Sequence, residues 1–275
     1  MVLFSIDVKR LTSRRHAIVA RYRAVARGQD RQWILLDGPH LAREAIAAGV
    51  RIDHIVIASD AIDRDEFAAI RDELARAGSE VLAGASAVMA AISPLRSPGD
   101  SVALAARPPA GDERIYGNPA ATVVIACDVQ DPGNLGAIVR VAEAAGASGV
   151  AVAGRSADPF GWKALRGSMG SALRLPIVMH PDLDDAIRAA RVAGCGVAAT
   201  VPRGGTSIFE ADLRRPVAVL IGGEGAGLPS TVVRNADWRL TIPMQPPVES
   251  LNAAVTAAVI LYEARRQRDR RSAGL

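Results

Sequence analysis

Short apolar runs alternate with amphipathic stretches along the chain, a pattern that predicts strands alternating with helices. In the N-terminal third, the helical period covers residues 14–27, 39–48 and 64–77, and apolar runs predict strands at residues 33–36 and 54–58. Further short apolar pieces extend to Ala106. This order is typical of a small α/β unit.

The alternation is more regular after residue 120. Strands are predicted at residues 121–126, 149–152, 175–178, 196–199, 217–221 and 238–242, and helices at residues 135–145, 164–169, 183–193, 228–235 and 250–267. Because these strands are nearly all apolar, we expect them to be buried on both faces. The residues alone therefore predict a doubly wound parallel sheet covered by helices.

A segment rich in Pro and Gly, residues 107–119, separates the two patterns and has no apolar period. We place the domain linker there, at residues 108–118. The predicted domains are then residues 1–107 and 119–275.

The composition is that of a folded globular protein, with 275 residues of which 49% are hydrophobic and 23% charged. No apolar run approaches the roughly 20 residues that a membrane helix needs, and the N-terminus lacks the order of a signal peptide. We therefore expect a cytoplasmic protein. The two cysteines, Cys127 and Cys195, lie far apart and outside any metal-ligand spacing, which predicts buried thiols and no metal site.

The net charge is only +4, but the basic residues are concentrated. Eight of them lie between Lys9 and Arg31 against the single acid Asp30, a pattern that favours phosphate binding. The predicted RNA contacts in this segment are Arg10, Arg14, Arg15, Arg21 and Arg23. Five more Arg residues lie between residues 265 and 271, where a solvated helix face is an equally good interpretation.

Three turns that follow predicted strands contain unusual polar residues, and ligands of α/β sheets bind at such turns. In the first, residues 128–140, Pro132 and Gly133 break the chain, and Asn134 is expected to cap the next helix. Arg140 lies about 140° from the apolar stripe of that helix, free to reach an acid or a phosphate. An exposed Arg on a helix needs no special function, so taken alone Arg140 is better explained as part of an ordinary helix surface.

The second turn has four glycines within residues 222–227, with Glu224 among them. It fits neither the dinucleotide fingerprint nor the phosphate-binding P-loop. The third turn, residues 242–252, is stiffened by prolines and leads into a helix that Glu249 or Ser250 is expected to cap, with Asn252 just inside it.

Together these turns resemble the three motifs of the SpoU (TrmH-like) branch of the SPOUT superfamily of RNA methyltransferases. The first family motif, D-x-x-D-P-G-N-L-G-x-x-x-R, is matched by residues 128–140, and the second, G-x-E-x-x-G-L-P, by residues 222–229. The third, with I-P-M followed by S-L-N-x-A-x-A, is matched by residues 242–257, with Val255 where many members have Ser. Residues 33–45 resemble, more loosely, the substrate-binding domain that often precedes this catalytic domain, although Asp37 stands where members commonly have Glu.

The resemblance implies an α/β fold whose C-terminal SPOUT domain combines a parallel sheet with a trefoil knot, preceded by a small α/β RNA-binding domain. It also implies a homodimer in which each active site receives residues from both subunits. The implied activity is methyl transfer from S-adenosyl-L-methionine (AdoMet) to a ribose 2′-hydroxyl of RNA, with 23S rRNA favoured by the N-terminal RNA domain. A tRNA substrate, and a non-catalytic RNA-binding protein with the same fold, stay open as alternatives.

The resemblance also assigns site residues. Arg140 is implied to activate the 2′-oxygen, with Asn134 and Glu224 positioning it. Ser250 and Asn252 are implied to hold either the target nucleotide or the arrangement of the site. Because arginine stays protonated, its role is open between base and electrostatic stabiliser. The implied cofactor site consists of Thr200, Val201, Gly223, Glu224, Gly227, Ile242, Met244, Leu251 and Asn252.

Overall fold

The computed structural model describes residues 8–225 and 227–272, and the chain divides into two compact units. The first unit contains residues 1–108 and 160–166, and the second contains residues 109–159 and 167–275. The segment 160–166, which the predicted domain limits assign to the C-terminal domain, clusters with the first unit. There Trp162 packs against the apolar core, and the Arg107 guanidinium lies 4.5 Å from the centre of the Phe160 ring. The domain limits drawn from the sequence remain a proposal.

The first unit is built on a mixed five-stranded sheet in the order β1-β4-β3-β5-β2. β1–β4–β3 are parallel, whereas β5 is antiparallel to β3 and β2. The strands are β1 (Lys9–Leu11), β2 (Trp33–Asp37), β3 (Ile52–Ala58), β4 (Glu80–Gly84) and β5 (Ser101–Ala106). The apolar pattern did not identify β4 and β5 as strands, although both lie within the apolar pieces that extend to Ala106. It also gave no sign of the short edge strand β1.

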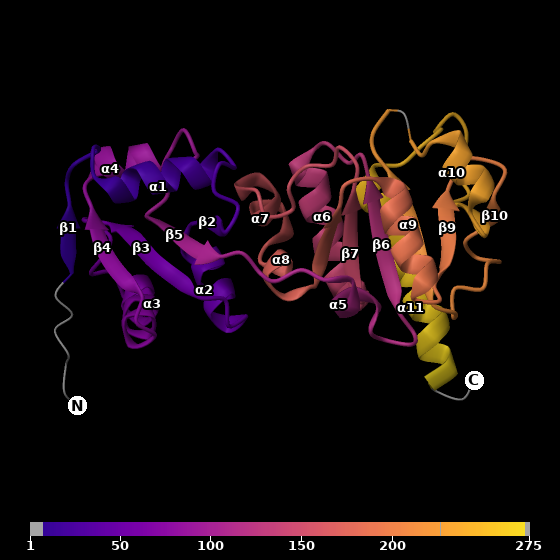
Figure 1. Cartoon of the computed structure of the whole chain (residues 1–275), viewed down its shortest axis with the longest axis horizontal. Coiled ribbons are helices and arrows are strands. Elements are labelled where there is room, and N and C mark those ends of the chain that lie inside the picture. The colour runs from indigo at the N-terminus through magenta and orange to yellow at the C-terminus, as the bar shows by residue number, and fades with distance from the viewer. Residues whose placement is uncertain (1–7, 226, 273–275) are drawn as a thin grey trace. The chain divides into compact units, whose positions relative to one another are not determined.

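Helices cover both faces of this sheet (Figure 1). α1 (Ala17–Ala26) and α4 (Ser86–Ile92) pack on one face through side chains such as Tyr22 and Met89. α2 (Pro39–Ala47) and α3 (Asp65–Arg76) contact each other and lie on the other face. The predicted small α/β unit is therefore present.

The second unit contains a seven-stranded sheet in the order β10-β12-β9-β11-β6-β7-β8, in which every neighbouring pair is parallel. The strands are β6 (Thr122–Cys127), β7 (Gly149–Ala153), β8 (Ile177–His180), β9 (Gly196–Thr200), β10 (Thr206–Ser207), β11 (Val217–Gly222) and β12 (Trp238–Thr241). The helices are α5 (Asp112–Tyr116), α6 (Pro132–Ala145), α7 (Trp162–Ser168), α8 (Ser171–Arg174), α9 (Leu183–Val192), α10 (Ser230–Asn235) and α11 (Ala253–Ser272), although most of α7 clusters with the first unit. The parallel sheet predicted from the apolar runs is confirmed.

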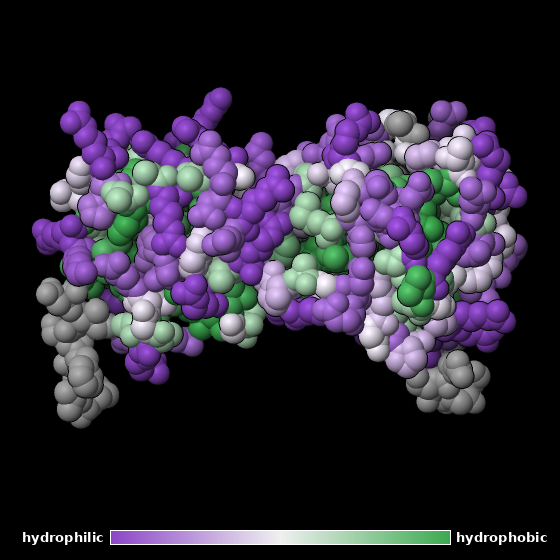
Figure 2. All heavy atoms as spheres, in the orientation of Figure 1, coloured by the Kyte–Doolittle hydropathy of each residue, from purple (hydrophilic) through white to green (hydrophobic). Residues whose placement is uncertain are grey.

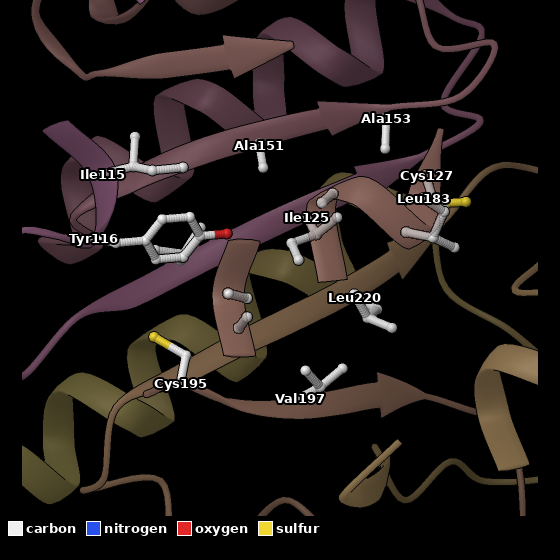
Figure 3. Close-up of a cluster of buried hydrophobic side chains, with 14 of the residues drawn as sticks. Ile115, Tyr116, Ile125, Cys127, Ala151, Ala153, Leu183, Cys195, Val197 and Leu220 are labelled. Atoms are coloured by element: carbon white, nitrogen blue, oxygen red, sulfur yellow. The ribbon is translucent and has the colours of Figure 1, made fainter. Parts of the chain in front are cut away.

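Alternate side chains of the central strands point to opposite faces of this sheet. Ile125 and Leu220 face a core formed with α5 and α9, which includes Tyr116 and both cysteines (Figure 3). α6 and α11 pack closely against each other, and both contact strands of the sheet. This double coverage explains why β6 and β7 are buried throughout.

Two local predictions differ from the structure. Residues 112–116 of the expected linker form α5, because Ile115 and Tyr116 bury their side chains in the second unit. Leu175 ends α8 instead of beginning a strand. The trefoil knot stays a prediction.

Of the C-terminal arginines, Arg265 and Arg266 are exposed, as the solvated-face interpretation expects, whereas Arg268 is half-buried within the fold. Arg265 donates to the carbonyl oxygen of Ala144 (3.0 Å), and Arg266 pairs with Glu263. Arg268 donates to the carbonyl oxygens of Ala120, Leu213 and Arg215. The side chains of Arg270 and Arg271 lie outside the described residues. No helix in the described part of the chain is long and apolar enough to span a membrane.

Candidate active site

The turns singled out in the sequence follow neighbouring strands and therefore meet at one edge of the second sheet. Cys127 of β6 pairs with Gly222 of β11, and Leu240 of β12 pairs with Thr200 of β9. Because all these strands are parallel, their carboxyl ends and the loops that follow lie on the same side.

The first turn is capped by a residue other than the predicted one. The Asp131 side chain accepts a hydrogen bond from the backbone N–H of Asn134 (2.8 Å) and so caps α6. The prediction that Asn134 is the cap is wrong, because Asp131 precedes the Pro that begins the helix. The amide group of Asn134 is thereby left free for other partners.

The three turns are joined through that amide. Asn134 Nδ2 donates to Glu224 Oε1, and Asn134 Oδ1 accepts from Asn252 Nδ2 (3.0 Å). The pattern also fixes the amide's orientation, since its nitrogen faces a carboxylate and its oxygen faces a donor. Three residues from distant parts of the sequence therefore form one polar group at the carboxyl edge, which we call the amide bridge.

Asn252 has a second role that the sequence interpretation missed. Its Oδ1 accepts from the N–H groups of Ala254 (2.9 Å) and Val255 (3.3 Å), so Asn252 caps α11. The predicted caps, Glu249 and Ser250, are not used in this way. Glu249 instead lies 3.5 Å from Arg203 across two exposed loops, and the Ser250 side chain makes no hydrogen bond to any described residue.

The glycines of the second turn are required either by close backbone approach or by left-handed backbone angles. A Cβ atom at Gly222 would lie 2.6 Å from the carbonyl carbon of Gly227, and one at Gly223 would collide with the carbonyl oxygen of Asp128. Gly225 and Gly227 adopt left-handed φ angles of 97° and 63°. The loop therefore folds back tightly beside the first turn and presents Glu224 to Asn134.

The loop after β7 also belongs to this edge, and the sequence analysis did not identify it. Asp128 has a φ of 53°, which is uncommon for a residue other than glycine, and its Oδ1 accepts from the N–H of Arg155 (2.7 Å). The sequence could have indicated Asp128, because it is the first Asp of the family motif. Arg155 belongs to no motif and could not have been found from the sequence.

Cys127 lies beside this edge but is not suited to nucleophilic chemistry. Burial and the neighbouring Asp128 carboxylate raise the pKa of the Cys127 thiol to about 12. Both cysteines are buried and free, as the sequence predicted. The thiol of Cys127 stays protonated at neutral pH.

Arg140 lies on a different face of α6 from Asn134. Six residues separate them, which corresponds to about 9 Å of rise and about 120° of rotation on an α-helix. The Arg140 side chain is exposed and makes no hydrogen bond or ion pair with any described residue. Within one chain, Asn134 and Glu224 bind each other and not Arg140, so the implied positioning of Arg140 by these residues stays a prediction.

The predicted cofactor residues lie in three places: the glycine loop, the end of β9 with the residue after it, and the segment after β12. The Thr200 hydroxyl donates to the carbonyl oxygen of Leu220 (2.8 Å), and the N–H of Val201 donates to the carbonyl oxygen of Leu240 (2.9 Å). Both hydrogen bonds connect neighbouring strands of the sheet. Ile242 and Met244 are partly exposed, and Leu251 is exposed. The backbone N–H groups of these three residues donate to no described residue. Free amides and apolar side chains beside a tight glycine turn suit a flat heteroaromatic ligand.

The structure separates the predicted RNA contacts of the first unit into two groups. Arg21 pairs with Asp53 (2.6 Å) and stacks 4.4 Å from the centre of the Trp33 ring, and Arg23 donates to the carbonyl oxygen of Ala91 (3.1 Å). Arg10, Arg14 and Arg15 are exposed, and their side chains bond to no described residue. Hydrophilic side chains cover much of the visible face of this unit (Figure 2).

Comparison with known proteins agrees with this geometry. Residues 121–262, more than half of the chain, match the SpoU rRNA Methylase family. The 23S rRNA (uridine(2479)-2′-O)-methyltransferase of Streptomyces viridochromogenes is 42% identical over 142 residues, 50% of each protein. The 23S rRNA (guanosine(2553)-2′-O)-methyltransferase RlmP of Bacillus subtilis is 36% identical over 137 residues, 50% of this chain and 55% of that protein. The match thus spans about half the length of these curated relatives.

The similarity in structure extends over both units. The AdoMet-bound rRNA methyltransferase from Sinorhizobium meliloti aligns with a TM-score of 0.82 and 32% identity, over 94% of this chain and 98% of that one. The three motif turns, the parallel sheet on which they meet and the family match lead to one conclusion: the chain belongs to the SpoU rRNA methylase family.

Proposed function

We propose that this protein is an AdoMet-dependent methyltransferase that modifies a ribose 2′-hydroxyl of 23S rRNA. The observation that carries the proposal is the amide bridge, in which Asn134 connects Glu224 and Asn252 at the carboxyl edge of the sheet. The names of the two 23S rRNA 2′-O-methyltransferases and of the AdoMet-bound structure support the substrate, the position and the cofactor. A ribosomal RNA substrate also favours the cytoplasm as the site of action.

AdoMet supplies an electrophilic methyl group on its sulfonium. The residues that would hold it are those around the glycine loop, with the N–H groups of Ile242, Met244 and Leu251 available to the adenine and methionine parts. When bound, AdoMet would supply this methyl group to the ribose 2′-oxygen, and the hydroxyl proton would leave to a base or water at the same edge. Glu224, oriented by Asn134, is a carboxylate at this edge that can accept a hydrogen bond from the substrate.

We further propose a homodimer in which Arg140 serves the site of the partner subunit. The support is geometric: Arg140 projects from α6 about 120° away from Asn134 and has no partner among the described residues. A guanidinium is a poor base, so its expected contribution is to stabilise the negative charge that develops on the 2′-oxygen. Ser250, exposed beside Asn252, is proposed to contact the target nucleotide.

The test is methyl transfer from labelled AdoMet to protein-free 23S rRNA transcribed in vitro, with bulk tRNA assayed in parallel. We expect label in 23S rRNA at one ribose, mapped as a single linkage that resists alkaline hydrolysis. The Asn134→Ala variant is expected to bind AdoMet in calorimetry but to lose transfer. Label in tRNA alone would overturn the rRNA assignment, and AdoMet binding without transfer to either RNA would favour a non-catalytic RNA-binding protein.

A further inference from the structure

We propose that Arg155, in the loop after β7, binds a backbone phosphate of the RNA next to the target nucleotide. The proposal rests on the function proposed above, because it assigns a substrate contact at the same edge. Neither the motifs nor the family match gives this residue a role.

The backbone that presents Arg155 is firmly built. Its N–H donates to Asp128 Oδ1 (2.7 Å), and the next residue, Ser156, accepts from the N–H of Val129 (3.0 Å) and donates to the carbonyl oxygen of Ala153 (2.8 Å). Ala157 adds a bond from its N–H to the carbonyl oxygen of Val129 (2.9 Å). The loop after β7 is thus joined to the loop after β6 at every residue from 155 to 157.

The backbone conformations of Gly154 and Asp128 allow the two loops to come this close. Gly154 has a φ of 66°, and a Cβ atom there would lie 2.6 Å from Asp128 Oδ1. Asp128 itself is left-handed, with a φ of 53°. Left-handed residues other than glycine cost conformational free energy and persist where the surrounding structure requires them, often at functional sites.

Asp128, which accepts the hydrogen bond from Arg155, also contacts the glycine loop. The carbonyl oxygen of Asp128 packs directly on Gly223, the residue before Glu224, with no room for a side chain between them. One short set of contacts therefore connects Arg155, Asp128 and the amide bridge. Asp128 therefore joins Arg155 to the glycine loop, through its side chain on one side and its carbonyl oxygen on the other.

The side chain of Arg155 remains available. It is exposed, and no described residue pairs with its charge, although most arginines of the second unit with comparable exposure are bound, as Arg174 is to Glu143 and Arg214 to Asp212. A guanidinium held on a rigid loop beside the reacting edge matches a phosphate, which it can bind in a bidentate manner. An RNA chain that places a ribose at the amide bridge carries phosphates on both sides of that ribose.

The experiment compares Arg155→Ala and Arg155→Lys with the wild type, using the same 23S rRNA transcript and labelled AdoMet over a range of salt concentrations. For Arg155→Ala we expect KM for RNA to rise about tenfold, with kcat changed less than about threefold and AdoMet affinity unchanged. The slope of log KM against log salt should fall by about 0.7 to 0.9, the value of one lost phosphate contact. Arg155→Lys should recover most of the affinity because it keeps the charge.

Arg215→Ala is the matched control. Arg215 is an exposed arginine of the same unit, but it precedes β11 and so lies at the amino edge of the sheet. Its replacement removes the same charge and should leave KM and the salt slope unchanged. If both variants weaken RNA use equally, or if Arg155→Ala changes neither quantity while the wild type methylates 23S rRNA, the proposal is wrong. Absence of transfer by the wild type would instead count against the proposed function.

Discussion

Single side chains at the carboxyl edge serve both the fold and the proposed chemistry. Asn252 caps α11 with its oxygen and holds Asn134 with its nitrogen, so one amide group satisfies two demands. Asp131 takes the capping role at α6 and leaves Asn134 to Glu224. An amide is suited to both tasks because it carries a donor and an acceptor on one rigid group.

Substitutions of Asn252 can separate its two roles. Asp is as good a helix cap as Asn, so Asn252→Asp should keep the unfolding free energy within about 0.5 kcal/mol, whereas Asn252→Ala should lose about 1 kcal/mol. Both variants remove the donor to Asn134 and are expected to lower kcat about 100-fold. Urea denaturation and the methyl-transfer assay measure the two effects.

A control for Asn252 is available in the same unit. Asn235→Asp changes an exposed amide at the end of α10, away from the amide bridge. It should alter neither the unfolding free energy nor kcat. Wild-type turnover by Asn252→Asp would show that the contact between Asn252 and Asn134 is not needed for transfer.

At the scale of elements, the glycine turn after β11 determines where Glu224 lies. Gly223 meets the backbone of Asp128, which directly follows β6 and cannot move aside as a flexible side chain would. Gly225, by contrast, has open space around its Cβ position and is a glycine because of its φ of 97°. The two glycines are required for different physical reasons.

This difference predicts different costs for the same substitution. Gly223→Ala should lower the unfolding free energy of the second unit by about 2 to 3 kcal/mol, since the added methyl group forces two backbone segments apart. Gly225→Ala should cost only about 1 kcal/mol, the cost of a left-handed conformation. Calorimetric thermal unfolding compares the two variants, and equal losses would contradict the packing argument.

At the scale of the whole molecule, the directions in which Asn134 and Arg140 project from α6 are the basis of the proposed dimer. Asn134 and Arg140 project in directions about 120° apart, and the first is bound within its own subunit while the second is not. A site that uses both residues is therefore expected to form across a symmetric dimer.

Mixing two inactive variants tests this arrangement. Arg140→Ala and Asn134→Ala homodimers are each expected to be inactive, but a heterodimer contains one site with both residues intact. Random exchange of subunits should then restore about a quarter of the wild-type activity. Preparations mixed without unfolding and reassociation serve as the control, and no recovery after exchange would place both residues in one subunit's site.

Much of this protein could be predicted from local patterns. The apolar runs of β6, β7 and β11 predicted a parallel sheet because strands buried on both faces leave no polar alternation, and the three turns carried the residue types that resemble one family. Asn134, Glu224 and Asn252 were identified in this way. The short strand β1 and the helix α5 were missed because elements of so few residues have no measurable period.

Only the tertiary structure decided how those residues are used. Capping by Asp131 and Asn252, the contact between Gly223 and Asp128, and the anchoring of Arg155 all depend on groups that are distant in sequence or on backbone angles that side-chain patterns do not encode. The same holds for Arg21 and Arg268, whose charges suggested RNA but whose partners lie inside the fold. Residue types and periods determine which elements form, whereas the pairing of polar groups is settled only when the strands bring their loops to one edge.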